Sequence, residues 1–432
     1  MLRCIDWQTL TPDEQLNLLA RPLQKNRLQA QVAEIIASVR EAGDSALQRF
    51  SLAFDNVELD GIGVSEEALQ TARIDNNALE AIETAISTIT TYHQSCKPQP
   101  MTVKTAKGVT IERLYRPIKR VGLYVPGGNN TPLISSLLMQ AIPAKIAGCE
   151  HIVLCTPANP QGEINPHLLV AAQLCGINTL YRIGGAQAIA AMAYGTESVI
   201  KADKLFGPGN AYVTEAKTQV AADPFAAAID MPAGPSEVMV VADNKANPEF
   251  VAADLLAQAE HGTDSQVFLL CDDLFFAQSV QQAVNKQGQQ LTRQSIINQS
   301  LKHSAIILCA SKKDQLAIIN HYAPEHLILN CEQAHDWVDE VESAGTIFVG
   351  AWAAESLGDY VTGSNHVLPT NGYARNHSGL STTDFMKAIT VQSVDETGML
   401  SLGKAAMTLA QLEGLDAHAQ AIKVRLTVLE EM

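Results

Sequence analysis

Short apolar runs that end in glycine or proline alternate with alanine-rich helical stretches along most of this chain, and this alternation constrains its fold most. One series of strand-like runs covers 121–125, 152–155, 179–183 and 204–206. A second series covers 238–241, 267–271, 305–309, 327–329 and 347–349. Strands that alternate with helices form parallel sheets covered by helices. We therefore predict an α/β fold with two related parallel-sheet domains.

The chain has 432 residues, which is too long for one hydrophobic core, so several segments are expected to fold around separate cores. We predict an N-terminal helical arm (1–20), a discontinuous first α/β domain (21–120 and 239–378), a second α/β domain (121–238) and a C-terminal helical tail (379–432). Strand signals fade after about Asn371, and Gly414 divides the tail. Helical spacing before the first sheet predicts one helix that ends at Gly43 and another that Ser65 caps and that runs toward Tyr92.

Charge and cysteine usage narrow the class of protein. A formal net charge of −16 argues against nucleic acid or an anionic membrane as partner, because both need a basic surface. No run of about 18 apolar residues predicts a membrane span, and 1–10 does not resemble a signal peptide. The 8 cysteines form no Cys-x-x-Cys pair, which is typical of a reducing compartment, so we expect a cytoplasmic protein.

Three glycine-rich turns each follow a strand-like run, at 124–128, 184–187 and 207–210. Turns at the carboxyl ends of parallel strands are where such folds bind ligands. None of the three matches the dinucleotide fingerprint G-x-G-x-x-G or a P-loop. Each alone is more typical of a structural turn, but three in succession favour a site whose ligand they do not name.

Two groups of polar residues could bind a metal ion. Gln258 and His261 lie three residues apart near the end of an expected helix, so they share one face. Asp359 follows Gly358 and could supply a carboxylate. A histidine at a helix end is more often a cap or a surface residue, so the local signal for a metal site is weak.

Two further groups could take part in proton transfer. Glu325 and His326 follow Pro324, and their side chains suit water activation and proton transfer near neutral pH. A polar loop beside a chance histidine is an equally good interpretation of that pair. Glu413 and His418 lie in the helical tail, where such residues are ordinarily solvated.

In this order and with these spacings, the motifs resemble those of the histidinol dehydrogenase family over nearly the whole chain. The similarity is densest at Val-Pro-Gly-Gly (125–128), Ile-Gly-Gly-Ala-Gln-Ala (183–188), Phe-Gly-Pro-Gly-Asn (206–210), Ala-Gly-Pro-Ser-Glu (233–237), Ala-Gln-Ala-Glu-His-Gly (257–262), Ala-Pro-Glu-His-Leu (323–327), Gly-Ser-Asn-His-Val-Leu-Pro-Thr (363–370) and Glu-Gly-Leu-Asp-Ala-His-Ala (413–419). The loop at 129–132 matches none of the expected ligand positions.

The resemblance implies one zinc ion per subunit, bound by Gln258, His261, Asp359 and His418. This set departs from the commonest catalytic zinc site, which has three protein ligands and an open position. In the family, the imidazole and amino nitrogens of the substrate complete a site of higher coordination. Zinc has no redox chemistry, so it would hold and polarise the substrate while NAD takes the hydride.

The resemblance also implies an activity, the four-electron oxidation of L-histidinol through L-histidinal to L-histidine. Glu325 and His326 match the acid–base pair: His326 would remove the alcohol proton, and Glu325 would activate a water that hydrates the aldehyde. Positions that contact substrate match Ser236, Gln258, His261, His326, Asp359, Glu413 and His418.

Cofactor and oligomer follow from the same resemblance. Tyr124, Gln187 and Asn210, one on each glycine-rich turn, match positions that contact the dinucleotide. Both sheet domains would then be incomplete, variant Rossmann-like domains, which accounts for the missing fingerprint. The family's active unit is a homodimer whose C-terminal tail crosses to the partner, so Glu413 and His418 would complete the neighbouring site.

Two other interpretations of the same residues are weaker. A zinc-dependent hydrolase or lyase on the same fold would also suit a metal with a glutamate and a histidine, but it leaves the three glycine-rich turns unexplained. A thiohemiacetal route through Cys149 or Cys155 is rejected, because Cys155 ends the apolar run 152–155 and such a cysteine is usually a small buried hydrophobe.

Overall fold

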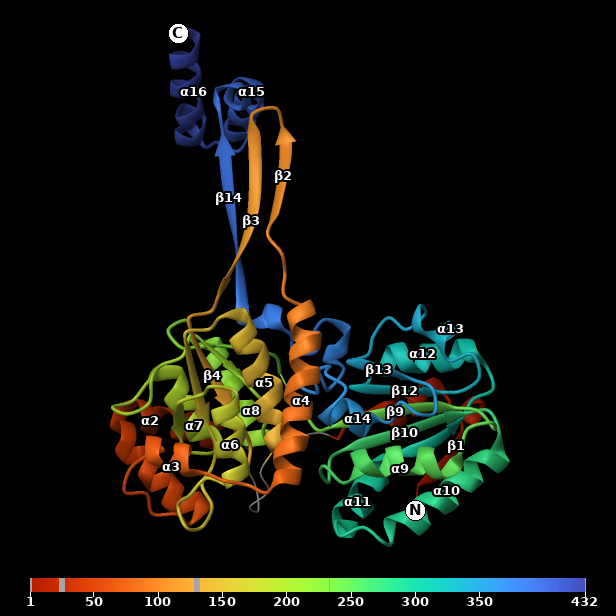
Figure 1. Ribbon diagram of the computed structural model, residues 1–432. Helices are drawn as coiled ribbons and strands as arrows, with labels where there is room; N and C mark the ends of the chain where they lie inside the picture. The colour runs from red at the N-terminus through yellow and green to blue at the C-terminus, as the bar shows by residue number, and fades with distance from the viewer. Residues whose placement is uncertain (1, 23–27, 128–132, 233, 432) are drawn as a thin grey trace.

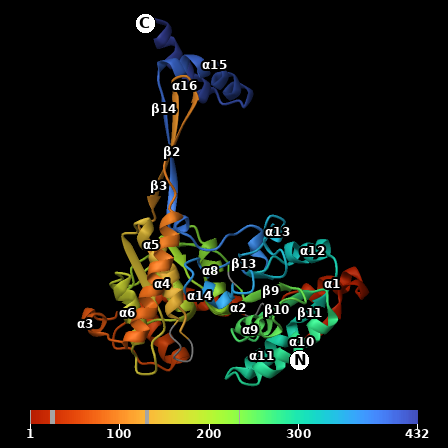
Figure 2. The same cartoon turned by 45° about the vertical axis from the view of Figure 1, so that its right-hand side comes forward.

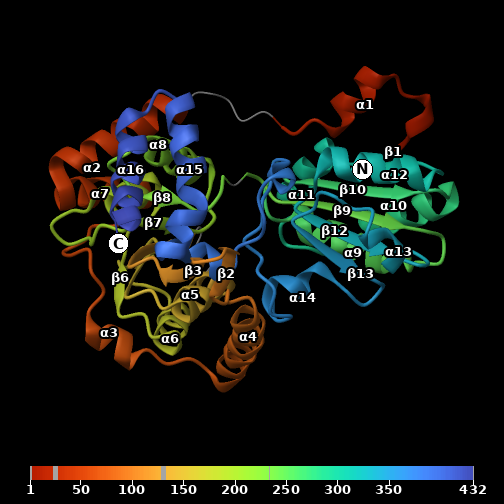
Figure 3. The same cartoon turned by 90° about the horizontal axis from the view of Figure 1, so that it is seen from above.

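The computed structural model describes residues 2–22, 28–127, 133–232 and 234–431. Gly128 of the first glycine-rich turn, the loop 129–132 and Ala233 lie outside the described residues. Two α/β bodies lie side by side, each built on its own sheet (Figures 1 and 3). A three-stranded stalk rises from the body with the five-stranded sheet and carries the last two helices (Figures 1 and 2).

The six-stranded sheet has the order β1-β11-β10-β9-β12-β13, and every neighbouring pair is parallel. Its strands are β1 (Arg3–Asp6), β9 (Glu237–Ala242), β10 (Gln266–Cys271), β11 (Ala305–Leu308), β12 (His326–Asn330) and β13 (Thr346–Val349). Helices α9 (Pro248–Ala259), α10 (Leu274–Gly288) and α11 (Gln294–Ser300) cover one face. Helices α1 (Pro12–Leu19), α12 (Lys312–Tyr322) and α13 (His335–Val338) cover the other. The central strands are therefore buried on both faces, as their unbroken apolar runs require.

The five-stranded sheet has the order β6-β5-β4-β7-β8 and is also parallel. Its strands are β4 (Arg120–Tyr124), β5 (His151–Cys155), β6 (Thr179–Tyr181), β7 (Lys204–Phe206) and β8 (Ala228–Ile229). Helices α2 (Leu28–Phe50), α7 (Gly185–Tyr194) and α8 (Ala211–Ala222) cover one face. Helices α3 (Glu66–Thr71), α4 (Asn76–Ser95), α5 (Ile134–Ala147) and α6 (Pro166–Leu174) cover the other. All nine predicted strand-like runs thus fall in the two parallel sheets.

The helices α2 to α4 pack on the five-stranded sheet, whereas the predicted domain boundaries place 21–120 with the six-stranded sheet. Val32 and Ile36 of α2 are buried beside α7, and Ile82 and Ile89 of α4 are buried with α5. An apolar stripe predicts that a helix packs on something, but it does not say on which sheet. The predicted helical arm at 1–20 also differs in part, because its first residues form the edge strand β1.

Local breaks in these helices have identifiable causes. Gly43 has φ 50° and ψ −131°, so it kinks α2, which continues to Phe50 instead of ending there. The side chain of Ser65 accepts a hydrogen bond from the backbone N of Ala68, as an N-cap does, but the helix that it begins stops at Thr71. Asp75 caps α4 separately.

The stalk is an antiparallel sheet of the order β14-β3-β2. Its strands are β2 (Met101–Ala106), β3 (Val109–Pro117) and β14 (Met386–Val394), and helices α15 (Glu396–Leu412) and α16 (Asp416–Glu431) follow. Gly414 takes φ 70° between the two helices, where glycine is favoured, so the predicted break is confirmed. The predicted all-helical tail is wrong at β14, whose residues are mostly exposed and lack a buried apolar pattern. Among the described residues, no helix is long and apolar enough to span a membrane.

Candidate active site

A cavity of about 500 Å³ lies between the two sheets. On one side it is lined by Pro126 after β4 and by Pro208–Asn210 after β7, at the carboxyl ends of the five-stranded sheet. On the other side it is lined by Ser236 before β9 and by His326 at the start of β12, at the amino ends of the six-stranded sheet. The expectation that ligands bind at carboxyl ends therefore applies to one sheet only.

The turn before β12 places Glu325 and His326. Helix α12 ends at Tyr322, and the next residue, Ala323, takes the left-handed conformation with φ 52° and donates its backbone N–H to Ile319 O. Pro324 cannot continue a helix, so the chain turns back at once into β12. This turn leaves both acid–base candidates buried at the wall of the cavity.

His326 lies at the centre of a polar cluster. Its Nδ1 is 2.7 Å from Nε2 of Gln258 and 3.1 Å from the carbonyl oxygen of Glu237. Its Nε2 is 3.7 Å from a carboxylate oxygen of Asp359. The Glu325 carboxylate accepts a hydrogen bond from the backbone N of Glu237 at 2.8 Å and lies 3.6 Å from His326 Nδ1. One imidazole thus contacts a carboxylate on each side.

Burial and charge together shift the pKa values of this cluster. Burial raises the pKa of Glu325 to about 8, although the charge of His326 opposes the shift. Burial likewise raises the pKa of Glu355, whose carboxylate is 4.0 Å from His326 Nδ1, to about 8. Burial lowers the pKa of His326, but the carboxylates of Glu325, Glu355 and Asp359 outweigh it and raise that pKa to about 10. Perturbed groups gathered in one cluster at the wall of a cavity are typical of a catalytic site.

Three of the four predicted zinc ligands, Gln258, His261 and Asp359, line this cavity. The helix α9 ends at Ala259, and the backbone N of His261 donates to Gln258 O, so both side chains stay near the helix end. The Oε1 atom of Gln258 is buried and has no hydrogen-bond partner among the described residues. Amide oxygen, imidazole nitrogen and carboxylate oxygen are donors that zinc accepts, so these residues fit the ion.

Asp359 also belongs to a second group of possible ligands. Donor atoms of His326, Glu355 and Asp359 all lie within 4.8 Å of one another. Burial raises the pKa of Asp359, but His326, His366 and His261 lower it to below its usual value, so its carboxylate is ionised. A cation that binds Asp359 could therefore take its other ligands either from Gln258 and His261 or from His326 and Glu355.

Sequence reasoning missed Glu355 and gave His366 no role. Glu355 begins α14 (Glu355–Tyr360) and lies one helical turn before Asp359, so the four-residue spacing of these two acids was the available signal. His366 Nδ1 is 2.8 Å from the carbonyl oxygen of Asp359, and its Nε2 is 3.4 Å from Ser136 Oγ of α5. It thus links the Asp359 turn to the other body.

The remaining predicted site residues fall in different places. Asn210 lines the cavity and caps α8, its side chain accepting from the backbone N of Tyr212 and Val213. Tyr124 and Gln187 are buried and do not line the cavity; the Tyr124 hydroxyl accepts from Gly185 N at 3.0 Å.

The two predicted tail residues lie away from the other ligands. Glu413 directly follows α15 and His418 lies on α16; both are exposed, and these helices stand at the far end of the stalk (Figure 1). Within one chain, the structure therefore does not bring them to the cavity.

Comparison with known proteins gives a consistent result. A family model described as histidinol dehydrogenase matches residues 19–426. Histidinol dehydrogenase of Legionella pneumophila is 59% identical over 429 residues, which are 99% of this chain and 100% of that protein. Histidinol dehydrogenase of Photobacterium profundum is 47% identical, over 100% of this chain and 97% of its own length. A solved structure of histidinol dehydrogenase from Elizabethkingia anophelis is 46% identical, with a TM-score of 0.95 over 99% of each chain. This chain therefore belongs to the histidinol dehydrogenase family.

Proposed function

We propose that the protein catalyses the NAD-dependent, four-electron oxidation of L-histidinol through L-histidinal to L-histidine, the last steps of histidine biosynthesis. The observation that carries this proposal is one cavity that holds the buried Glu325–His326 pair beside Gln258, His261 and Asp359. Family membership supports the same activity. An alcohol oxidation needs a base for the hydroxyl proton, a group that orients the substrate and a hydride acceptor.

Gln258, His261 and Asp359 would hold the zinc ion, and His418 of a second copy would complete its protein ligands. When bound, zinc supplies orientation and polarisation of the substrate, and NAD supplies the hydride acceptor. Asn210, Tyr124 and Gln187 are proposed for the cofactor, on the side of the cavity formed by the five-stranded sheet.

His326 would take the proton from the substrate hydroxyl. Its Nε2 is buried, has no hydrogen-bond partner among the described residues and lies 3.7 Å from Asp359. With Asp359 bound to the ion, its charge would contribute less to holding a proton on the imidazole, which would favour the neutral form of His326 that can accept a proton. The contacts of Nδ1 with Gln258 and Glu237 hold the His326 imidazole in place while Nε2 accepts the proton.

Glu325 would activate the water that hydrates the aldehyde. Its carboxylate sits beside the imidazole, and the N–H of Glu237 stabilises the charge that develops when Glu325 loses its proton. Because the two bases have different surroundings, they can serve different steps of one reaction sequence.

The active unit is proposed to be a homodimer with shared sites. Glu413 and His418 are remote from the cavity of their own chain, and helix α15 leaves Leu400, Leu409 and Leu412 exposed. Exposed apolar groups on a projecting unit are typical of an interaction surface. A two-fold partner would cover them and deliver the tail residues to two equivalent sites.

The direct test supplies the protein with zinc, L-histidinol and NAD and follows NADH. Formation of NADH that requires both the alcohol and the enzyme is expected. A hydrolase or lyase on this fold would consume a substrate without NADH, and a protein that forms no NADH under these conditions would contradict the proposal.

Replacing His261 with Ala is expected to strip zinc from the protein or weaken its binding greatly, because an essential ligand is lost, and activity should fall with metal content. Glu355→Gln is the matched control, since it alters a buried neighbour of Asp359 outside the proposed ligand set and should retain zinc. Metal analysis of the two purified variants measures the zinc content of each. Full zinc and turnover in His261→Ala would remove the assignment, and zinc loss in Glu355→Gln would move the metal to the His326–Glu355–Asp359 group.

Exchange of Cys149 and Cys155 for Ala is expected to keep most of the activity. Cys155 is fully buried at the end of β5, and burial raises the pKa of Cys149 to about 12, so neither supplies a thiolate near neutral pH. Neither residue lines the cavity. The double variant should oxidise histidinol at a rate close to wild type; a loss of several orders of magnitude in a folded variant would restore the thiohemiacetal route.

A further inference from the structure

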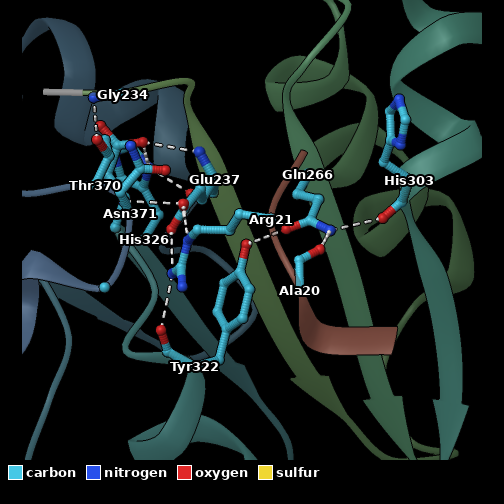
Figure 4. A network of polar contacts seen from close by, with 12 residues as sticks. Ala20, Arg21, Gly234, Glu237, Gln266, His303, Tyr322, His326, Thr370 and Asn371 are labelled. Carbon is cyan, nitrogen blue, oxygen red and sulfur yellow. Dashed lines mark hydrogen bonds and ion pairs between the residues drawn. The ribbon is translucent and has the colours of Figure 1, made fainter. Parts of the chain in front are cut away.

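A largely buried ion pair lies close to the acid–base pair. The guanidinium of Arg21 binds the Glu237 carboxylate through two contacts, Nε to Oε1 at 2.5 Å and Nη2 to Oε2 at 2.9 Å. The Glu237 side chain is 3% exposed and that of Arg21 19%. Arg21 Nη2 also donates to the carbonyl oxygen of Tyr322 at 2.8 Å, and its guanidinium lies 4.0 Å from the centre of the Tyr322 ring (Figure 4).

Glu237 connects this pair to the reacting groups through its own backbone. Its N–H donates to the Glu325 carboxylate at 2.8 Å. Its carbonyl oxygen is 3.1 Å from His326 Nδ1 and 3.2 Å from Gln258 Nε2. The side chain that Arg21 holds therefore belongs to the residue whose peptide groups contact both proposed bases and one proposed zinc ligand.

The position of Arg21 is itself fixed by neighbours. The preceding carbonyl oxygen, of Ala20, accepts from Gln266 Nε2 at 3.0 Å, and Gln266 Oε1 accepts from the Tyr322 hydroxyl at 2.9 Å. On the other side of the pair, the backbone N of Asn371 donates to Glu237 Oε1 at 3.0 Å (Figure 4). The segment after α1 is thereby tied to the start of the central strand β9.

We propose that Glu237, clamped by Arg21, is a positioning residue for the two oxidations. The fork of an arginine on a carboxylate fixes direction as well as distance, so the pair sets where the Glu237 N–H and C=O point. These groups in turn set the Glu325 carboxylate and the His326 imidazole. A misplacement of about 1 Å in a catalytic group can cost about 100-fold in rate. The inference rests on the proposed function, and it gives neither residue a contact with substrate.

The test compares Arg21→Met, Glu237→Gln and the double variant with wild type, measuring kcat, KM for histidinol and NAD, zinc content and Tm. Each single variant is expected to lose about 10- to 100-fold in kcat, with both KM values and zinc near wild type. Each should also lower Tm, because one charge is left without its partner in a buried or largely buried place. Arg21→Lys keeps the charge without the fork and should recover part of kcat.

The double variant separates positioning from folding. It removes both buried charges, so Tm should recover relative to the single variants, whereas kcat should stay low because the clamp is absent. Arg120→Met is the matched control: Arg120 pairs with Asp203 at 2.7 Å, half-exposed and away from the cavity, and its loss should leave kcat within about twofold.

Three results would overturn the proposal. These are wild-type kcat in the folded single variants, recovery of kcat together with Tm in the double variant, and zinc loss that accounts for the lost activity. A wild-type protein that forms no NADH from histidinol overturns the proposed function, whereas an active wild type with equally active variants overturns only the positioning role.

Discussion

Replacement of His326 by Asn is expected to slow both oxidations by about 10²–10⁴-fold, the usual cost of losing a general base, because each step needs a proton removed. The imidazole is the group that contacts Gln258, Glu237 and Asp359 at once, and no second imidazole of the described structure has that set of neighbours. The measurement compares NADH formation from histidinol in a single turnover with NADH formation from supplied histidinal.

Glu325→Gln is expected to behave differently in the same two assays. The amide keeps the shape of the side chain but cannot activate water, so oxidation of histidinal should be slowed by a similar factor while the first hydride transfer is affected much less. Both variants should retain zinc. Retained zinc would show that the loss of rate arises in proton transfer and not in metal binding. Equal impairment of the two half-reactions by Glu325→Gln would contradict the division of labour.

Mixing two inactive variants, His261→Ala and His418→Ala, is expected to restore about a quarter of wild-type activity after joint unfolding and refolding. Random pairing makes roughly half of the dimers mixed, and each mixed dimer has one site with both lesions and one with neither. The expectation follows from the distance of His418 from the cavity of its own chain, at the end of the stalk (Figure 1).

Each variant refolded alone is the control and should stay inactive. If His418 served its own chain, every site of a mixed dimer would keep one lesion and the mixture would also stay inactive. No recovery, with mixed dimers shown to be present by a size-tagged copy of one variant, would remove the shared site and leave the zinc assignment of His261 standing.

The parallel sheets could be predicted because strands that are buried on both faces consist of continuous apolar runs, such as 238–241 and 267–271. The stalk could not be predicted in this way. Strand β14 is mostly exposed on both faces in this chain, and its pairing with β3 joins residues that are far apart in sequence. Edge strand β1 was likewise missed, because Arg3–Asp6 is too short to show a period.

The site also has a part that the sequence predicts and a part that it does not. Glu325 and His326 are adjacent in sequence, so the local sequence alone indicates an acid–base pair. Glu355 looks like an ordinary helix residue, and only tertiary packing buries it beside His326. The clamp on Glu237 comes from Arg21, which is 216 residues away in sequence, and no local pattern connects the two.

The central claim, that this chain oxidises histidinol fully to histidine, is tested most directly by quantifying NADH and L-histidine in one sample of zinc-loaded protein. Four electrons leave as two hydrides, so about two NADH should form for each L-histidine. Removal of zinc should stop both products together. One NADH for each accumulated histidinal, or loss of histidinol without NADH, would contradict the account.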